Sequence, residues 1–524
     1  MTIDRRLIGG EALARAVEAA YAKGQTDYYL EPLALEDENG EPVGKIKNGD
    51  KVIFCCRRGE REIELTDAFT DENFAGFHRE RLRDLTFVIM TMYHDKYKDL
   101  PIAFAPEKVI KPLAQVVSEA GLRQFHCAES EKYAHVTYFF NGGRNEPFAG
   151  ETDMCLASPK GIAFDKKPEL SLPEIATQVK EAVDDGYPFI LTNFANGDVI
   201  GHTSNTSAKL EAARFISRYT EDVAIYAKKH GYVVFITADH GNIETLYGAG
   251  GKPHVAHTTN PVPFIVIDPK GRDPKLRNGR IGDVAPTILS VLGLEQPEEM
   301  TGGSLIGAKD FDNDRVMLIV LDGWGCGTAD ENDGIHLADT PEWDSLLAAF
   351  PNSRLRASGS DVGLQDGKPG NSEAGHLNLG AGRIVMQDDV RMDRAIREGE
   401  FRTNPVFLKV IEDTKRGGAL HLLAYLTDKS SHGSIEYPLM LAEMAQGIEE
   451  IYFHIIFDGR STEPGSAPSL LRELDDRLAS IGCGRIVDGV GRGLALDRDR
   501  NYAGIERVYR CLTRGEATRY RLGL

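Results

Sequence analysis

The sequence predicts an α/β protein of two domains, each a mainly parallel sheet flanked by helices. Apolar runs such as 316–321 (VMLIVL) are continuous, which is typical of strands buried on both faces of a parallel sheet. Segments with helical spacing of apolar residues, such as 208–231, lie between such runs and give a βαβ rhythm. A chain of 524 residues is long enough for two large domains, each with its own core.

Composition and charge restrict the possible functions. A formal charge of −19 argues against a surface for nucleic acid or anionic membrane, but it leaves room for a local basic pocket that binds a small anion. The seven cysteines form no C-x-x-C pair, so we expect reduced thiols in a cytoplasmic protein. The sequence shows no apolar run of membrane-spanning length and no signal peptide, so we expect no membrane partner and no export.

Acidic and imidazole side chains follow three of the predicted strands, and two more histidines precede a fourth. These residues are Asp198 and His202, Asp239 and His240, Asp322, and then His254 and His257. In open α/β sheets ligands gather beyond the carboxyl ends of the strands, so these side chains are expected to share a site. Taken singly, each histidine fits an ordinary core or surface residue. Their recurrence at successive strand ends favours two divalent metal ions of the Mn or Zn type, which clamp the oxygens of a transferring phosphoryl group.

The stretch GNSEAGH (370–376) places Ser372 among glycines, an amide, a carboxylate and an imidazole. A G-x-S-x-G nucleophile elbow needs glycine at 374, where this chain has Ala374. An isolated serine here would be a helix cap. Beside two metal ions, Ser372 is instead expected to attack phosphorus as a metal-activated nucleophile. No Walker A loop competes, because GLQDGKPG (363–370) has the wrong glycine spacing.

A second set of predicted strands ends in cationic side chains. Helical stretches at 435–447 and 467–482 lie between these strands. The cationic residues are His432, Arg460, Arg492 and Arg498, with Arg57, Arg58 and Arg61 after the strand near 51–56. Singly, each arginine is expected to be solvated or paired on the surface. Repeated after strands, they suit a small phosphorylated acid, because the guanidinium fork binds carboxylate and phosphate bidentately.

Long motifs in this chain resemble one enzyme family, the cofactor-independent (2,3-bisphosphoglycerate-independent) phosphoglycerate mutases. The motifs cover nearly the whole chain: DGWG (322–325), GNSEAGHLNLGAGRI (370–384), EKYAHVTYFFNGG (131–143), NGDVIGHT (196–203), TADHGN (237–242) and PHVAHTTNPVPF (253–264). The resemblance implies membership of the alkaline phosphatase superfamily, with a two-metal domain and a transferase domain that binds substrate.

The order of these motifs differs from the usual order in the family. Members typically begin with the DGWG strand, whereas here the AHTTN segment comes first and a polar stretch at 306–315 joins it to DGWG. The chain therefore resembles a circular permutation, which is tolerated where termini lie close together on the surface. We expect a contiguous phosphatase-like domain at 105–392 and a split transferase-like domain at 1–104 and 393–524.

The resemblance also implies roles for individual residues. One metal would be held by Asp198, His202 and His257, and the other by Asp322, Ser372, Asp239 and His240, with Ser372 as the phosphoserine nucleophile. The implied substrate contacts are His432, Arg460, Ser461, Arg492, Arg498, Arg58, Arg61 and Lys132. Only the resemblance distinguishes Lys132 from an ordinary surface lysine.

Three positions depart from the family pattern. Ser461 stands where the family has an aspartate thought to move a hydroxyl proton, and serine is a poor general base. The sequence reads RGER at 58–61 instead of RPDR, and TDKSSHGS at 427–434 instead of a glycine-rich segment that also carries the histidine. A family branch with rearranged acid and base groups would explain these changes, and so would a shifted substrate.

The sequence therefore predicts interconversion of 3-phosphoglycerate and 2-phosphoglycerate in glycolysis and gluconeogenesis, through phosphorylated Ser372. The expected cofactors are two divalent ions, Mn²⁺ in particular, without 2,3-bisphosphoglycerate. The resemblance implies a monomer, and the need to exclude water implies closure of one domain over the other. The alternatives are a two-metal phosphatase or phosphomutase acting on another small phosphorylated or phosphonylated acid, and a non-catalytic binding protein in which Ser461 marks lost chemistry.

Overall fold

The computed structural model describes residues 7–57, 61–307, 311–427 and 432–523, and the chain divides into two compact units. Unit 1 comprises Met1–Pro106 and Arg391–Leu524, and unit 2 comprises Glu107–Val390. Among the described residues, no helix combines the length and the apolar character needed to cross a membrane. All seven cysteines are free.

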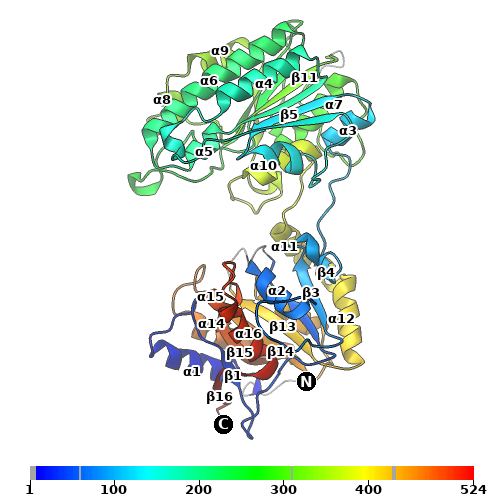
Figure 1. Cartoon of the computed structure of the whole chain (residues 1–524), viewed down its shortest axis with the longest axis vertical. Helices are drawn as coiled ribbons and strands as arrows, with labels where there is room; N and C mark the ends of the chain where they lie inside the picture. Colours follow the sequence, from blue (N-terminus) through cyan, green and yellow to red (C-terminus); the bar gives the residue numbers. More distant parts are fainter. Residues whose placement is uncertain (1–6, 58–60, 308–310, 428–431, 524) are drawn as a thin grey trace. The chain divides into compact units, whose positions relative to one another are not determined.

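Unit 2 is built on an eight-stranded sheet with the order β10-β12-β9-β8-β11-β7-β5-β6 (Figure 1). Its strands pair in parallel except for β8 with β9 and β9 with β12. They are β5 (Gln124–Glu129), β6 (Glu151–Leu156), β7 (Phe189–Phe194), β8 (Val233–Thr237), β9 (Val262–Ile267), β10 (Gly279–Arg280), β11 (Val316–Leu321) and β12 (Asn352–Arg356). The central strand β11 is buried along its whole length, as its continuous apolar run predicts.

Helices cover both faces of this sheet. On one face α4 and α6 pack on each other and on the central strands, while α7 packs on β11 and contacts α10 (Figure 1). The helix predicted near 208–231 is α6, and the side chain of Asn205, the residue before it, caps the helix by accepting from Ala208 N. The helices are α3 (Leu113–Glu119), α4 (Leu172–Asp184), α5 (Asn196–Gly201), α6 (Thr206–Lys229), α7 (Val284–Leu292), α8 (Gly334–Leu337), α9 (Pro341–Ala349) and α10 (Ser372–Ala381), with a π-helical turn η4 (His135–Phe139).

Unit 1 contains a second eight-stranded sheet, with the order β16-β1-β15-β14-β13-β2-β3-β4. Its strands pair in parallel except for β1 with β15. They are β1 (Leu33–Leu35), β2 (Lys51–Phe54), β3 (Thr86–Thr91), β4 (Ile102–Phe104), β13 (Leu420–Leu426), β14 (Ile451–Phe457), β15 (Arg485–Gly491) and β16 (Thr518–Tyr520). Both ends of the chain therefore contribute strands to one sheet.

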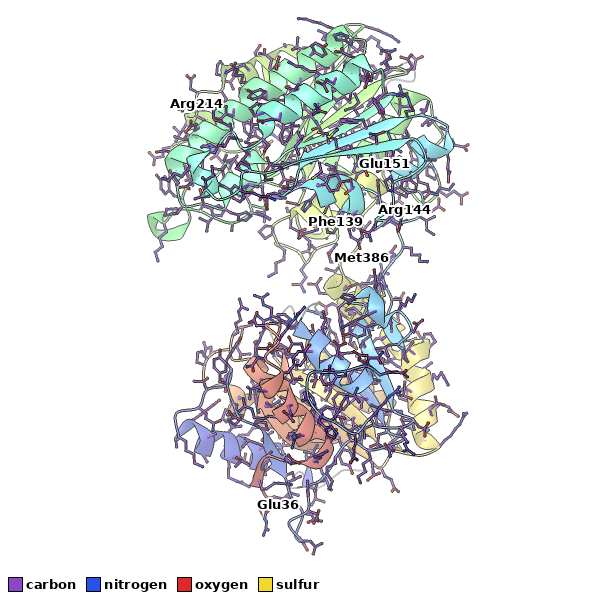
Figure 2. All side chains as sticks on the ribbon, viewed as in Figure 1. Glu36, Phe139, Arg144, Glu151, Arg214 and Met386 are labelled. Carbon is purple, nitrogen blue, oxygen red and sulfur yellow. The ribbon has the colours of Figure 1, made fainter. Side chains whose placement is uncertain are left out.

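Two hydrophobic clusters in unit 1 account for its two helical layers. One cluster joins residues of α1, α12, α13 and α14, and the other joins residues of α2 and α16. The helices are α1 (Gly10–Tyr21), α2 (Ile63–Thr70), α11 (Asp388–Glu398), α12 (Pro405–Lys415), α13 (Glu436–Met444), α14 (Ala467–Ile481), α15 (Arg492–Ala495) and α16 (Tyr502–Arg514). Figure 2 adds the side chains to both units. The predicted fold class, two mainly parallel sheets flanked by helices, is confirmed.

Candidate metal centre

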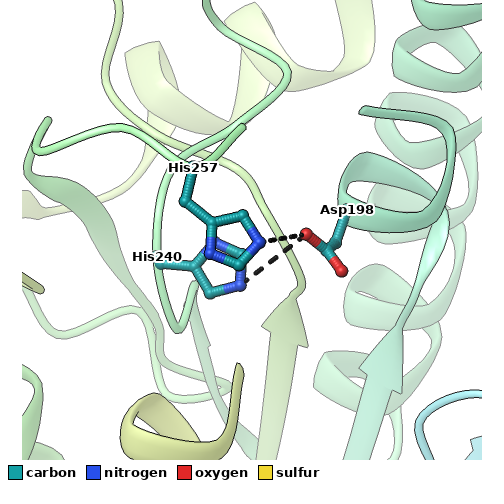
Figure 3. Close-up of side chains that lie close together, drawn as sticks. All are labelled: Asp198, His240 and His257. Carbon is teal, nitrogen blue, oxygen red and sulfur yellow. Dashed lines mark ion pairs between the residues drawn. The ribbon is translucent and has the colours of Figure 1, made fainter. Parts of the chain in front are cut away.

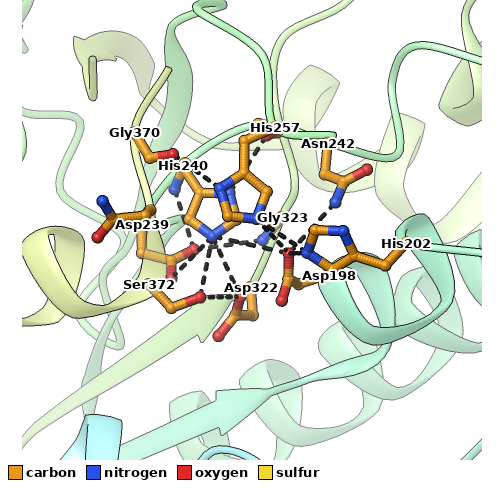
Figure 4. Close-up of polar contacts among 12 residues, drawn as sticks. Asp198, His202, Asp239, His240, Asn242, His257, Asp322, Gly323, Gly370 and Ser372 are labelled. Carbon is orange, nitrogen blue, oxygen red and sulfur yellow. Dashed lines mark hydrogen bonds and ion pairs between the residues drawn. The ribbon is translucent and has the colours of Figure 1, made fainter. Parts of the chain in front are cut away.

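The side chains predicted as metal ligands lie together in unit 2 (Figure 4). Asp198 lies in α5 directly after β7, and Asp322 follows β11. Gly323 then takes a φ of +74°, and a side chain there would meet the Asp198 backbone nitrogen at 2.7 Å. Glycine at this position therefore allows the segments that carry Asp322 and Asp198 to approach each other closely.

Three histidines face the carboxylate of Asp198. Its Oδ1 lies 3.0 Å from His257 Nε2, 3.2 Å from His202 Nε2 and 3.8 Å from His240 Nε2. The rings of His240 and His257 stack with their centroids 3.9 Å apart (Figure 3). The Nε2 atoms of His202 and His257 are only 3.0 Å apart.

The other nitrogen of each ring faces a backbone carbonyl. These Nδ1 contacts are His202 to Val255 O at 2.9 Å, His257 to Gly370 O at 2.8 Å and His240 to Gly241 O at 3.2 Å. Because a carbonyl oxygen can only accept, each Nδ1 is assigned the proton and each Nε2 keeps its lone pair. Three lone pairs then converge on one carboxylate, an arrangement that is repulsive unless a cation lies among them.

A second group lies beside the first and shares His240 with it. Asp239, His240 and Asp322 are buried, and their ligand atoms lie within 4.8 Å of one another. Ser372 Oγ is 3.0 Å from His240 Nε2 and donates to Asp322 Oδ1 at 3.1 Å. Asn371, not Ser372, caps α10 by accepting from Ala374 N, so the reading of Ser372 as a helix cap is wrong.

Lys132 joins the two groups. Its buried ammonium donates to Asp198 Oδ2 at 2.7 Å, Asp322 Oδ1 at 2.8 Å and Ser372 Oγ at 2.7 Å. Burial alone would lower the pKa of Lys132, but the carboxylates of Asp322 and Asp198 outweigh burial and raise it. The ammonium is therefore held charged beside the serine hydroxyl.

The two aspartates that contact Lys132 respond differently to their surroundings. Burial would raise the pKa of Asp198, but the charge of the Lys132 ammonium outweighs burial and holds it well below its usual range. Burial and the Asp239 carboxylate raise the pKa of Asp322. A single ammonium thus leaves part of the buried negative charge uncompensated.

The residues present fit a divalent metal. Asp239 Oδ2 is buried and has no hydrogen-bond partner within the described ranges, although His376 Nδ1 lies 3.3 Å from it, and three carboxylates converge with three imidazole rings. Mixed carboxylate and imidazole donors suit first-row divalent metals. Unit 2 therefore provides a divalent-metal site.

Three polar residues that support this centre were not singled out from the sequence. Asn193 Nδ2 donates to Asp322 Oδ2 at 2.8 Å and lies 3.0 Å from His376 Nε2. Asn242 Nδ2 donates to Asp198 Oδ1 at 3.2 Å. A polar residue inside the apolar run FILTNF signals Asn193, and the GNSEAGH stretch already contains His376.

In unit 1, Arg492 forms the core of a buried basic group. Its Nη1 donates to Tyr425 Oη at 2.6 Å and to Asp458 Oδ1 at 2.9 Å, while its Nε and Nη2 are buried and have no hydrogen-bond partner among the residues that the structure describes. Tyr425 also lies beside the ring of His432, with centroids 6.3 Å apart. A buried guanidinium with unused donors is suited to an anion. Asp458 and Tyr425 were not predicted, although Asp458 stands in the strand end IYFHIIFDGR.

The other predicted substrate residues are more dispersed. Arg61 Nη1 donates to the carbonyl oxygen of Leu496 at 3.0 Å. Leu496 follows Arg492 closely in the sequence. Ser461 is exposed, and its backbone nitrogen donates to Asp458 Oδ2 at 3.2 Å. Arg460 and Arg498 are exposed, and Arg58 lies outside the described residues.

Comparisons with known proteins agree with this architecture. Residues 32–296, just over half of the chain, match the model of the metalloenzyme superfamily, and residues 392–522 match the model described as the N-terminus of BPG-independent PGAM. Two proteins named 2,3-bisphosphoglycerate-independent phosphoglycerate mutase are similar: one from Thermomicrobium roseum, 47% identical over 302 residues, and one from Syntrophotalea carbinolica, 44% identical over 298 residues. Each alignment covers 56% of this chain, and the chain spans 57% of the length of each relative.

A solved structure of Leishmania mexicana phosphoglycerate mutase at low cobalt concentration is 30% identical, covers 52% of this chain and 53% of its own, and superposes with a TM-score of 0.38. The superfamily match includes Asp198, His202 and the Asp239–His240 pair. The chain therefore belongs to the metalloenzyme superfamily.

Proposed function

We propose that this protein interconverts 3-phosphoglycerate and 2-phosphoglycerate without 2,3-bisphosphoglycerate, in glycolysis and gluconeogenesis. The position of Ser372 carries the proposal, because its hydroxyl contacts Lys132, Asp322 and His240 at the metal centre. The names of the two similar mutases support the choice of reaction.

Two divalent ions, Mn²⁺ in particular, are proposed to bind here. Asp198, His202 and His257 would hold one, and Asp239, His240, Asp322 and Ser372 the other. When bound, the ions lower the pKa of the serine hydroxyl and offset the charge of the phosphoryl oxygens.

The chain's own residues prepare Ser372 for attack. Asp322 Oδ1 accepts the hydroxyl proton, and the Lys132 ammonium donates to the same Oγ, which stabilises developing negative charge. A bond forms between Oγ and phosphorus as the bond from phosphorus to the substrate oxygen breaks. The other glycerate hydroxyl then takes the phosphoryl group back and frees Ser372. Since Ser372 opens α10, the positive end of a ten-residue helix also favours the phosphoryl oxygens.

Arg492 is proposed to bind the glycerate carboxylate through Nε and Nη2, which the described part of the chain leaves without hydrogen-bond partners. Arg61 and His432, together with the predicted Arg460, Arg498, Arg58 and Ser461, are proposed as further substrate residues. Burial of Ser372 and Lys132 limits the access of water, which would otherwise hydrolyse the phosphoserine.

The order of the two family matches supports a circular permutation. The model described as an N-terminus matches residues 392–522, after the superfamily match at 32–296. We propose that residues 105–392 form a phosphatase-like domain and that 1–104 with 393–524 form the transferase-like domain, a division that the two compact units support. We also propose that the protein is a monomer and lies in the cytoplasm.

One observation favours a second candidate, a two-metal phosphatase or another phosphomutase. Ser461 is exposed and offers no carboxylate at the position where the mutases carry an aspartate. A proton acceptor for the glycerate hydroxyl would then have to come from another residue, or the substrate would have to differ.

An activity assay separates the two candidates. Purified protein with Mn²⁺ and 3-phosphoglycerate, without 2,3-bisphosphoglycerate, is followed for 2-phosphoglycerate and free phosphate in the same tube. We expect 2-phosphoglycerate with little phosphate. Phosphate as the main product would support the phosphatase, and no turnover of either kind would reject both for this substrate.

A further inference from the structure

A second polar cluster lies in unit 2, on strands β5 and β6, and shares no residue with the centre around Ser372. In the parallel register of these strands, His126 pairs with Asp153 and Gln124 with Glu151. Because side chains alternate along a strand, all four project from the same face of the sheet. Strand β6 is the edge of the sheet, and Glu151 begins it (Figure 2).

The ligand-type atoms of this cluster converge on His126 Nδ1. It lies 3.3 Å from Glu151 Oε1, 3.9 Å from Asp153 Oδ1 and 2.9 Å from the carbonyl oxygen of Val136 in η4. Donors bound to one ion at about 2.0–2.2 Å lie roughly 3.0–3.6 Å apart, so these separations are close to those of a coordination shell. The His126 and Glu151 side chains are fully buried, and the Asp153 side chain is 9% exposed.

Both ring nitrogens of His126 face oxygens that can only accept. Gln124 Nε2 donates to Ala114 O at 2.8 Å, which orients the amide so that its Oε1 faces His126 Nε2 at 3.2 Å. An amide oxygen can only accept, and so can the Val136 carbonyl that lies 2.9 Å from Nδ1, so a neutral imidazole with its single N–H satisfies only one of these two acceptors. A cation at Nδ1 or a second proton on the ring removes this conflict.

Two oxygens in this cluster lack the partners that buried oxygens normally have. Asp153 Oδ1 and Asn141 Oδ1 are buried and find no hydrogen-bond partner in the part of the chain that the structure describes, although Asn141 Nδ2 donates to Glu151 Oε1 at 2.6 Å. Glu151 Oε2 accepts only from Phe148 N, at 2.8 Å, among the contacts described here. Two adjacent buried carboxylates without a lysine or arginine partner in the described contacts call for a positive charge.

We propose that His126, Glu151, Asp153 and the Val136 carbonyl bind a divalent first-row metal ion, separate from the centre around Ser372. One imidazole with carboxylate and carbonyl oxygens suits Mn²⁺ or Zn²⁺. The hydrogen bond to Gln124 orients the ligating histidine, as outer partners of metal-bound imidazoles do. The ion would join the edge strand β6 to β5 and η4, so its role is structural.

Counting Mn²⁺ sites tests the proposal. The metal-free full-length chain is titrated with Mn²⁺ while free Mn²⁺ is measured by electron paramagnetic resonance. Asp153→Asn and His126→Gln are expected to bind one ion fewer per chain than the wild type. Glu174→Gln, which removes an exposed carboxylate on α4 of the same unit, is expected to bind the wild-type number. Equal numbers in the wild type and in folded Asp153→Asn would mean that only a proton occupies the cluster, and would overturn the proposal.

A measurement on the wild type covers the case in which the variants do not fold. Crystals grown with Mn²⁺ are measured at the manganese absorption edge. An anomalous peak within bonding distance of His126 Nδ1 and Asp153 Oδ1 supports the site, and the absence of such a peak overturns it. Mutase turnover of Asp153→Asn is expected to stay within about twofold of the wild type, so a failed mutase assay and a failed ion count are distinguishable results.

Discussion

Lys132 is the residue on which the charge balance of the proposed catalytic site depends. Its ammonium contacts two carboxylates and the Ser372 hydroxyl, and no other lysine or arginine does so among the described contacts. Without it, the buried aspartates would repel one another and the serine would lose a donor.

Lys132→Met is therefore expected to reduce kcat by about 10²–10³-fold, the usual cost of removing one donor that stabilises developing charge. Steady-state kinetics at saturating Mn²⁺ measure this, with circular dichroism to confirm folding. Lys180→Met is a matched control, since Lys180 contacts Asp222 on the surface of the same unit. A kcat within twofold of the wild type would show that Lys132 serves only the fold.

Arg492→Lys keeps the positive charge but removes the planar guanidinium group, which can form two parallel hydrogen bonds with a carboxylate. We expect kcat/KM for 3-phosphoglycerate to fall by about 10²-fold or more, mainly through KM, because a lysine cannot replace bidentate recognition. Arg507→Lys, on the surface of the same unit in an ion pair with Glu31, serves as the control. Equal losses in both variants would mean that the Arg492 effect is not specific to substrate.

Individual residues show which parts of the candidate site could be predicted from the sequence alone. The strand-end positions of Asp198, Asp239 and Asp322 follow from the apolar runs before them, and the structure brings these residues together. His240 belongs to both groups and stacks on His257, and sequence spacing reveals neither contact. Their roles as ligands stay predictions.

At the level of secondary structure, a buried chain of four side chains crosses strands of unit 1. Asp50 Oδ2 lies 3.1 Å from His421 Nε2, His421 Nδ1 lies 2.8 Å from His454 Nε2, and His454 Nδ1 lies 2.6 Å from Asp488 Oδ2. The chain ties β13, β14 and β15 to the loop before β2. The apolar runs that contain His421, His454 and Asp488 predict these strands but not the hydrogen bonds between them.

This chain of side chains makes the stability of unit 1 depend on pH. Burial lowers the pKa of His421 to about 4, below the value near 6.5 of an exposed histidine. Between these values the unfolded chain binds a proton that the folded chain does not, so the free energy of unfolding decreases as pH falls from about 6.5 to 4. The contribution of His421 to this decrease is on the order of 3 kcal/mol.

Hydrogen exchange of the β13 amides at pH 7 and pH 5, corrected for intrinsic rates, measures this loss. His421→Gln is expected to show a pH dependence shallower by about one proton. Burial would raise the pKa of Asp50, but its hydrogen bond with His421 and those from two backbone amides outweigh burial and lower it, so Asp50 contributes only at lower pH. An unchanged slope in His421→Gln would assign the pH dependence to other groups.

The whole chain divides into a contiguous unit and a discontinuous one. The main core of unit 2 is formed by residues between Leu113 and Leu379. In unit 1, β2 pairs with β13, and α1 packs on α14, so its core needs both ends of the chain. A fragment of residues 107–390 is therefore expected to fold and melt cooperatively, whereas residues 1–106 alone are expected to stay unfolded, as circular dichroism with thermal melting would show. A folded 1–106 fragment would contradict this division.

The assignment of segments to the two units could be predicted from the sequence only through its long family motifs. Apolar periodicity predicts two parallel sheets but does not say which strands share a sheet. The pairing of β1 with β15 and β16 joins residues nearly the whole chain apart, and such contacts leave no local signal. The edge positions of β6 and β4 were likewise not predictable from periodicity.

The proposed reaction requires that Ser372 carry the phosphoryl group during turnover. Wild-type protein with Mn²⁺ is mixed with 3-phosphoglycerate, quenched in acid during turnover, digested and analysed by mass spectrometry, with Ser372→Ala treated in parallel. We expect a phosphoryl group on Ser372 in the wild type, and neither the modification nor 2-phosphoglycerate formation in Ser372→Ala. Sustained conversion to 2-phosphoglycerate by Ser372→Ala, or a phosphoryl group trapped on another residue, would contradict the proposed role of Ser372.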